Sequence, residues 1–447
     1  MLPLVLSVVV LIVNLMHRPA RPRSDASVVH RYEEPVPLLP PKKASVVHRY
    51  EEPVPLLLPE KPPEPQRPEP AQEESYSYSY SYDKVKLVPP QGWEAWVRRF
   101  EDPNSQRYVI VDAKNGLGNR LRALCSAMSV AASIHRPVLL IWHPDLHCNC
   151  SFDRLYSSPL PFALLSEEIP RANLTSTWFQ AYNYMRPEPG AIKDEEIVVD
   201  PRRHLYFKSG FVMNHFRGQW KFAQRYLQPP YMPMPVPAVT DKLVADGSFV
   251  GLHVRNIFDA PRDTESNRLT EGNSAMEGAE KEYGKSGTEE LLKWRRASHW
   301  SNFITKMREM MEEHAVSHPP PLHPPLKFYL AADSAEAYDG LVRSFSTGAV
   351  LLTRRDCGTG RCDFRDCESM IYSLVDMLNL ARTKLILGSG YSSYSEVAAR
   401  MGGTSGDRLG GRGLPILMAG RDFGDTILPP PAKKPRPGWS RRRSWWQ

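Results

Sequence analysis

One stretch of the chain, residues 108–128, constrains the fold most. It reads YVIVDAKNGLGNRLRALCSAM: an apolar, mostly β-branched run ends at polar residues, and apolar positions at helical spacing begin at Leu117. The pattern predicts a buried strand followed at once by a helix. Four more apolar runs predict strands, at 137–142, 249–255, 327–332 and 384–388. A helix is predicted at 291–314, and this alternation of strands and helices indicates an α/β fold.

Proline separates the folded body from the rest of the chain. The repeat ASVVHRYEEPVPLLPPKK at 26–43 returns almost unchanged at 44–61. Proline fixes φ and removes a backbone donor, so these repeats predict an extended stalk. A second proline-rich passage, at 228–237, predicts the seam between two halves of the body. We therefore expect five parts: an N-terminal segment at 1–16, a disordered stalk at 17–90, lobes at 91–240 and 241–430, and a disordered tail at 431–447.

The two ends of the chain differ in character. The first sixteen residues are apolar, and basic residues follow them. The segment is shorter than the roughly 20 residues of a spanning helix and lacks the basic start of a signal peptide. We interpret it as a signal-anchor that binds the membrane, with a signal peptide or a misassigned start as alternatives. Six of the +7 net charges lie in the tail. The body is therefore nearly neutral, which argues against a nucleic-acid partner.

The six cysteines and two glycosylation sequons, at Asn149 and Asn173, favour an oxidising secretory compartment. The cysteines are spaced C-x-C at 148–150 and C-x4-C-x4-C at 357–367. Neither spacing has the paired CxxC pattern of a zinc site. We expect disulfides or free thiols, and no metal site.

The loop at 116–120, Gly-Leu-Gly-Asn-Arg, is the first candidate site. Glycines between a strand and a helix let the backbone approach a ligand, and the helix N-terminus favours anions. A dinucleotide loop would carry a third glycine where Leu121 stands, and a Walker loop would continue Gly-Lys-Ser/Thr. The loop therefore predicts an anion site of another kind, with a tight turn capped by Asn119 as the alternative.

The strand at 249–255 supplies the second candidate site. His253 and Arg255 alternate along it and so share one face, close to the point where the strand ends. Ligands lie at the carboxyl ends of strands in open α/β sheets. The arginine fork suits diphosphate oxygens, and histidine can hydrogen-bond a sugar. An ordinary basic strand end is the alternative.

The third candidate site is LILGSGYSSYSEVAARMGG at 385–403, a strand that leads through glycines and serines into a helix. Ser393 and Glu396 have capping-box spacing, which predicts that the helix begins near Ser393. Its free amides and the hydroxyls of Ser392, Ser393 and Ser395 would form a second anion site.

The three motifs, in this order, resemble those of the GDP-fucose-dependent fucosyltransferase superfamily, which includes alpha-1,6-, nodulation and protein O-fucosyltransferases. The likeness covers roughly residues 105–405, with LAADS, which ends a strand at Asp333, and a helix with Asp376 between the last two motifs. The resemblance implies two Rossmann-like lobes facing a cleft (GT-B type), with the donor held mainly by the second. It also implies a metal-independent, inverting enzyme that needs no cofactor.

By position, the resemblance places Asn119 near the transferred sugar and Arg255 at the β-phosphate of the leaving GDP. The chain has no Asp-x-Asp metal pair, so arginine and helix amides must meet that charge. Asp263 is the candidate acceptor base, and Asn256 stands where the alpha-1,6 branch has a second arginine. The remaining candidates would contact nucleotide or phosphate: Gly116, Gly118, His253, Asp333, Asp376, Ser392, Ser393 and Ser395. An isolated aspartate after a strand is otherwise a turn or helix cap.

We therefore expect a membrane-anchored glycosyltransferase in the lumen of the Golgi or endoplasmic reticulum. It would move fucose from GDP-fucose to a hydroxyl of a glycan or glycoprotein. Two alternatives stay open: a non-catalytic nucleotide- or sugar-binding protein on the same scaffold, and a glycosyltransferase that uses another nucleotide sugar.

Overall fold

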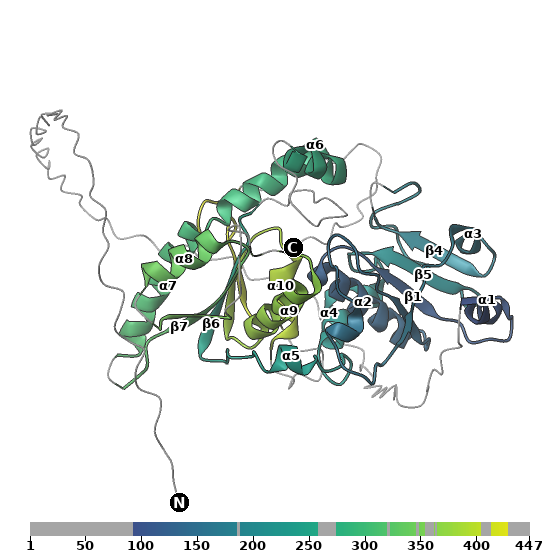
Figure 1. The fold of residues 1–447 in the computed structure, drawn as a ribbon, viewed down its shortest axis with the longest axis horizontal. Helices are drawn as coiled ribbons and strands as arrows, with labels where there is room; N and C mark the ends of the chain where they lie inside the picture. The colour runs from purple at the N-terminus through teal and green to yellow at the C-terminus, as the bar shows by residue number, and fades with distance from the viewer. Residues whose placement is uncertain are drawn as a thin grey trace, which may run out of the picture. The chain divides into compact units, whose positions relative to one another are not determined.

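The structure is a computed structural model, and it describes residues 93–427 with seven gaps, at 186–187, 258–273, 320–321, 346–347, 354–361, 363 and 404–412. The N-terminal segment, the stalk, the tail and Asp263 lie outside the described residues. The described chain contains two parallel five-stranded sheets (Figure 1). This confirms the α/β class predicted from the alternation of strands and helices.

The first sheet has the order β3-β2-β1-β5-β4, and every neighbouring pair is parallel. β1 is central, pairing Val109 with Val138 of β2 and with Leu205 of β5. All five residues of β1 are buried, and four of them are apolar. The fifth, Asp112, accepts a hydrogen bond from the Tyr206 hydroxyl and lies 3.0 Å from Lys114 Nζ. The strands are β1 (Val109–Ala113), β2 (Val138–Ile141), β3 (Ala163–Leu165), β4 (Phe179–Asn183) and β5 (His204–Ser209).

The second sheet has the order β10-β9-β6-β7-β8, again parallel throughout. Its central strand β6 pairs with β7 on one side and with β9 on the other, so the strand order reverses between β6 and β9. Such a reversal opens a crevice at the carboxyl ends of the two strands. The strands are β6 (Phe249–Val254), β7 (Lys327–Ala332), β8 (Val350–Leu352), β9 (Leu385–Gly388) and β10 (Ile416–Met418).

The helices connect the strands. Before and within the first sheet these are α1 (Trp93–Glu101), α2 (Leu117–Ser133), η2 (Phe152–Arg154) and α3 (Arg171–Leu174). The passage to the second sheet holds η3 (Phe216–Gly218), α4 (Trp220–Ala223), η4 (Gln224–Leu227) and α5 (Pro237–Thr240). The second sheet is accompanied by α6 (Ser274–Ala297), α7 (Trp300–Ser317), α8 (Ala335–Ser344), α9 (Cys367–Ala381) and α10 (Ser393–Met401).

The predicted strands are confirmed, and one predicted helix is wrong. The single helix expected at 291–314 is two helices, because α6 ends at Ala297 and α7 begins at Trp300. His299 caps α7, accepting a hydrogen bond from the Ser301 amide at Nδ1. A side-chain acceptor at this position satisfies a free helix amide and starts a new helix. Within the described chain, no helix is long and apolar enough to cross a membrane.

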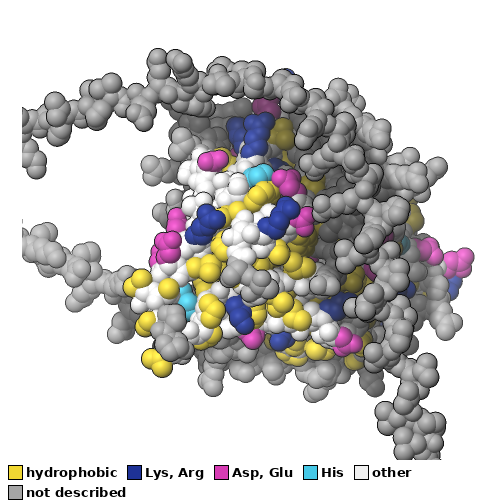
Figure 2. All heavy atoms as spheres, turned by 60° about the vertical axis from the view of Figure 1, so that its left-hand side comes forward, with side chains coloured by type: hydrophobic (Ala, Val, Ile, Leu, Met, Phe, Trp, Pro, Cys, Tyr) yellow, Lys and Arg dark blue, Asp and Glu magenta, His cyan; other side chains and the backbone are white. Residues whose placement is uncertain are grey.

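The largest hydrophobic core contains buried side chains from helices of both lobes. Leu124 and Met128 of α2 belong to the same cluster of buried side chains as Leu374 of α9 and Val397 of α10. Figure 1 shows α2 beside α9 and α10, and α2 packs on both. On the face that Figure 2 turns forward, basic side chains of the described residues stand in small separate groups, with acidic and apolar side chains between them.

A buried histidine makes the stability of the first sheet depend on pH. His204 accepts the Tyr108 amide at Nδ1 and bonds the Phe100 carbonyl at Nε2, so the neutral ring fits both partners. Burial lowers the pKa of His204 to about 4. Below its unfolded pKa of about 6.5, the unfolded chain gains a proton that the folded chain lacks. We expect the free energy of unfolding to fall by about 2 kcal/mol from pH 6.5 to 5.

Urea unfolding at several pH values checks this expectation. His204→Asn should lose the slope of about 1.4 kcal/mol per pH unit that one proton gives, whereas His323→Gln, at an exposed position, should keep it. An unchanged slope in His204→Asn would contradict the assignment.

Candidate functional site

The N-terminal ends of α2 and α10 meet at the carboxyl edges of the two sheets. Gly118 permits this approach: a Cβ there would lie 3.2 Å from the Tyr394 Cα and 3.3 Å from the Ser393 carbonyl oxygen. Gly116 has an ordinary φ of −66°, and a Cβ at this position would have its nearest neighbour, the His147 carbonyl oxygen, at 3.9 Å. The backbone at Gly116 therefore stays accessible beside the cavity. Gly118 therefore permits close packing of the two helices, whereas Gly116 keeps the backbone accessible to a ligand.

The arginine of the same motif is structural. Arg120 is fully buried and donates to the carbonyls of Asn115 and His143 at 2.8 and 2.7 Å. Its Nη2 lies 2.6 Å from a carboxylate oxygen of Asp145. Arg120 therefore connects the loop after β1 to the loop after β2, and this connection holds the N-terminal end of α2 in place.

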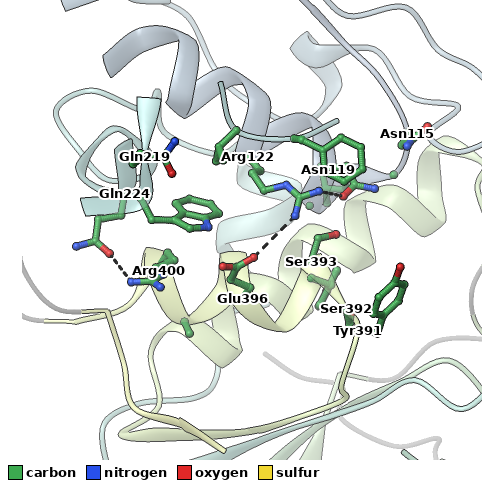
Figure 3. Close-up of a pocket in the computed structure, with 18 of the residues that line it drawn as sticks. Asn115, Asn119, Arg122, Gln219, Gln224, Tyr391, Ser392, Ser393, Glu396 and Arg400 are labelled. Carbon is green, nitrogen blue, oxygen red and sulfur yellow. Dashed lines mark hydrogen bonds and ion pairs between the residues drawn. The ribbon is translucent and has the colours of Figure 1, made fainter. Parts of the chain in front are cut away.

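A cavity of about 2230 Å³ lies where the two helices begin, lined by residues of both lobes. It is lined by the residues that the motifs placed at the chemistry, Asn119 and Arg255, and by the serines Ser392 and Ser393. Figure 3 shows Asn119 and the two serines at the cavity. A drug-sized ligand site measures roughly 300–1,000 Å³. The volume therefore has room for two substrates at once.

The cavity lining is basic. Among the described residues, eight arginines and lysines line it, against three carboxylates, those of Asp194, Glu196 and Glu396. Such a surplus of cations focuses a positive potential into a concave site and attracts anions. The cations are Arg122, Lys193, Lys221, Arg255, Arg295, Arg365, Arg400 and Arg421.

The end of β6 is braced against the end of β9. The Arg255 amide donates to Ser389 Oγ at 2.7 Å, and Ser389 Oγ donates to the His253 carbonyl at 2.9 Å. The Arg255 side chain lines the cavity, but His253 is buried and does not. His253 Nδ1 lies 2.6 Å from Ser395 Oγ, and its ring stacks on Tyr394. His253 and Ser395 thus join β6 to α10 behind the cavity wall.

The two predicted aspartates also lie behind the cavity wall. Asp333 accepts hydrogen bonds from the amides of Asn256 and Ile257 and so holds the loop that follows β6. Asp376 is 2% exposed and accepts a hydrogen bond from the Tyr329 hydroxyl at 2.7 Å. Neither aspartate lines the cavity. Their contacts in this structure hold the loop and the helix in position.

The start of α10 differs from the predicted capping box. Ser392, not Ser393, is the N-cap residue, and its side chain makes no capping hydrogen bond. The Ser392 hydroxyl is buried and finds no hydrogen-bond partner within the described part of the chain. Glu396 turns instead toward Arg122 of α2, with 3.8 Å between Oε2 and Nη1. A buried hydroxyl without a partner costs free energy, which makes Ser392 a candidate contact for a ligand.

Arg122 is a cavity residue that the motif reading missed. Its Nη2 donates to Asn119 Oδ1 at 2.9 Å and to the Gly210 carbonyl at 2.6 Å, and its guanidinium lies over the Phe211 ring. Burial lowers the pKa of Arg122. The spacing of three residues from Asn119 puts both side chains on one helix face, and this signal was available in the sequence.

The passage from 211 to 227 forms a wall that no motif predicted. Arg400 of α10 lies over the Trp220 ring, 5.6 Å from its centre, and donates to Gln224 Oε1 at 3.1 Å. Phe216, 70% exposed, stands near Phe222 on the same wall. Apolar rings beside fixed polar groups are typical of small-molecule sites. No cluster of three or more His, Cys, Asp or Glu residues suited to a metal ion occurs among the described residues.

No protein-family model and no curated protein sequence matches the chain. Solved structures do resemble it. The fucosyltransferase NodZ from Bradyrhizobium is 16% identical with a TM-score of 0.40, over 66% of this chain and 93% of its own. Arabidopsis thaliana FUT1 with GDP is 13% identical with a TM-score of 0.41, over 75% and 78%. POFUT1 with GDP is 13% identical with a TM-score of 0.39, over 71% and 99%.

Proposed function

We propose that the protein is a glycosyltransferase of the GT-B type that transfers fucose from GDP-fucose to a hydroxyl of a glycan or glycoprotein. The observation that carries the proposal is the meeting of Asn119, Arg255 and Ser393 at one basic cavity. Next to them is the Ser392 hydroxyl, which has no hydrogen-bond partner among the described residues. These residues come from three motifs that are far apart in the sequence. Their ordered occurrence and their common cavity support one donor site.

The cavity suits a departing nucleoside diphosphate. When the bond between the sugar and the β-phosphate breaks, negative charge develops on the leaving oxygen and must be met by cations or dipoles. The guanidinium of Arg255 supplies a cation, and the start of α10 supplies the positive end of a helix dipole, so the charge is met without a metal ion. Inversion at the anomeric carbon requires the acceptor to attack from the side opposite the leaving GDP. We propose the wall that contains Trp220 and Arg400 as the acceptor surface.

The setting of the enzyme is part of the proposal. We place it in the lumen of the Golgi or endoplasmic reticulum, anchored by residues 1–16. The bond between Cys150 and Cys367 supports an oxidising compartment, and the exposed Asn149 fits a glycosylation site. A non-catalytic binding protein on this scaffold would hold the same ligand and release no product.

Thermal shift with GDP, UDP and CMP tests the choice of nucleotide. A ligand that binds only the folded state at 100 times its Kd stabilises it by about 2.7 kcal/mol. We expect GDP to raise Tm by several degrees, with UDP and CMP giving much smaller shifts. Labelled GDP-fucose then separates an enzyme from a binding protein, because only the enzyme releases GDP. A larger shift with UDP or CMP would contradict the proposed donor.

A further inference from the structure

One carboxylate of the cavity lies near residues of two predicted anion sites, the loop at 116–120 and the helix start at Ser393. Glu396 lies in the first turn of α10, three residues after Ser393, and its side chain is 31% exposed at the cavity. Its Oε2 faces Nη1 of Arg122 at 3.8 Å, and Nη2 of that guanidinium holds Asn119 Oδ1 at 2.9 Å (Figure 3). Glu396 and Asn119 thus bind two nitrogens of a single side chain, so the carboxylate lies close to the position assigned to the transferred sugar.

Transfer to a hydroxyl requires a base. As the acceptor oxygen forms its bond to C1 of fucose, the bond from C1 to the β-phosphate oxygen breaks, and its electron pair leaves with GDP. The hydroxyl proton must pass to a group within hydrogen-bond reach. Resting on the function proposed above, we propose that Glu396 is this general base and that Arg122 is the positioning residue that directs its carboxylate toward the acceptor.

Besides His147, whose backbone lies beside Gly116, three other cavity bases are less suitably placed. Asp194 and Glu196 belong to the segment after β4, on the wall of the first lobe, whereas Glu396 stands on the helix that presents Ser392 and Ser393. His215 already accepts the Arg217 amide at Nδ1, where it caps η3. Glu396 is the carboxylate that contacts the Asn119 network directly. Asp263, expected from the family resemblance, is the rival to be tested beside it.

Azide separates a general base from a structural residue, because this anion attacks carbon without a proton to lose. The experiment measures GDP release from GDP-fucose in buffer, where water is the acceptor, and in buffer with sodium azide. In Glu396→Gln, release to water should fall about a hundredfold or more. Release to azide should stay within about threefold of the wild type. The thermal shift with GDP should not change.

The controls make each outcome decisive. Glu309→Gln removes an exposed carboxylate of α7 that does not line the cavity and should leave both rates unchanged. Equal loss of the water and azide rates in Glu396→Gln would show that the residue only supports the fold, which overturns the inference. An unaffected water rate in Glu396→Gln would also overturn it. The same holds if Asp263→Asn instead loses the water rate and keeps the azide rate. If the wild-type chain binds GDP but releases none from GDP-fucose in either buffer, the proposed enzymatic function itself fails.

Discussion

Replacing Arg255 by alanine is expected to lower the release of GDP from GDP-fucose about a thousandfold and to weaken GDP binding at least about tenfold. Removing one group that meets the charge of a transition state costs about a hundredfold to a thousandfold, and an arginine acting on a phosphate reaches higher values. The fold should survive, because the Arg255 amide, and not its side chain, makes the hydrogen bond to Ser389 that braces β6. Turnover and GDP titration of the purified variant measure both effects.

Two further variants show whether charge or geometry matters at this position. Arg255→Lys keeps the charge but loses the planar fork, so turnover should recover only in part. Arg421→Ala also removes a cation from the cavity lining, but Arg421 is paired with Asp422 and its side chain is 59% exposed. It should lose little activity. Full turnover in Arg255→Ala, or an equal loss in Arg421→Ala, would remove the reason for placing the phosphate at Arg255.

The sequence predicted the parts of the fold that depend on local pattern. The apolar run that begins at Tyr108 and the helix from Leu117 appear as β1 and α2 within a residue, because a buried parallel strand is rich in apolar residues. The break at Ser298 and His299 was missed. Helical periodicity continues across it, and only the cap formed by the His299 ring separates the two helices.

The site was predicted where a motif places a residue at the end of a strand or the start of a helix. Arg255 and Ser393 share one cavity because they follow neighbouring strands of the second sheet, whose carboxyl ends lie at one edge. Asn119 reaches the same cavity from the first lobe because α2 packs on α10. Whether a motif side chain is buried or lines the cavity could not be predicted in this way. His253 is two residues from Arg255 and yet is buried against Ser395. The wall built around Trp220 depends on long-range packing of irregular chain, for which no periodic signal exists.

The bond between Cys150 and Cys367 joins residues that are 217 positions apart. It connects the segment after β2 in the first lobe with the first residue of α9 in the second. Beside it, the Asn149 amide donates to the Arg365 carbonyl at 2.8 Å, and the Arg365 side chain lines the cavity. A cross-link over so long a loop mainly restricts the unfolded chain, and its removal costs about 2–5 kcal/mol. The bond therefore supports both the union of the lobes and the position of Arg365.

Replacing either bridging cysteine by alanine is therefore expected to lower the free energy of unfolding by about 2–5 kcal/mol, measured by urea titration. Either single variant breaks the whole bridge, so Cys150→Ala combined with Cys367→Ala should cost no more than one alone. Cys148→Ala removes a buried thiol that bridges nothing and should cost about 1 kcal/mol. GDP affinity should fall together with stability in the bridge variants only, because they release the chain that carries Arg365. Additive losses from the two cysteines would show that they act by packing, and unchanged GDP affinity would separate the bridge from the donor site.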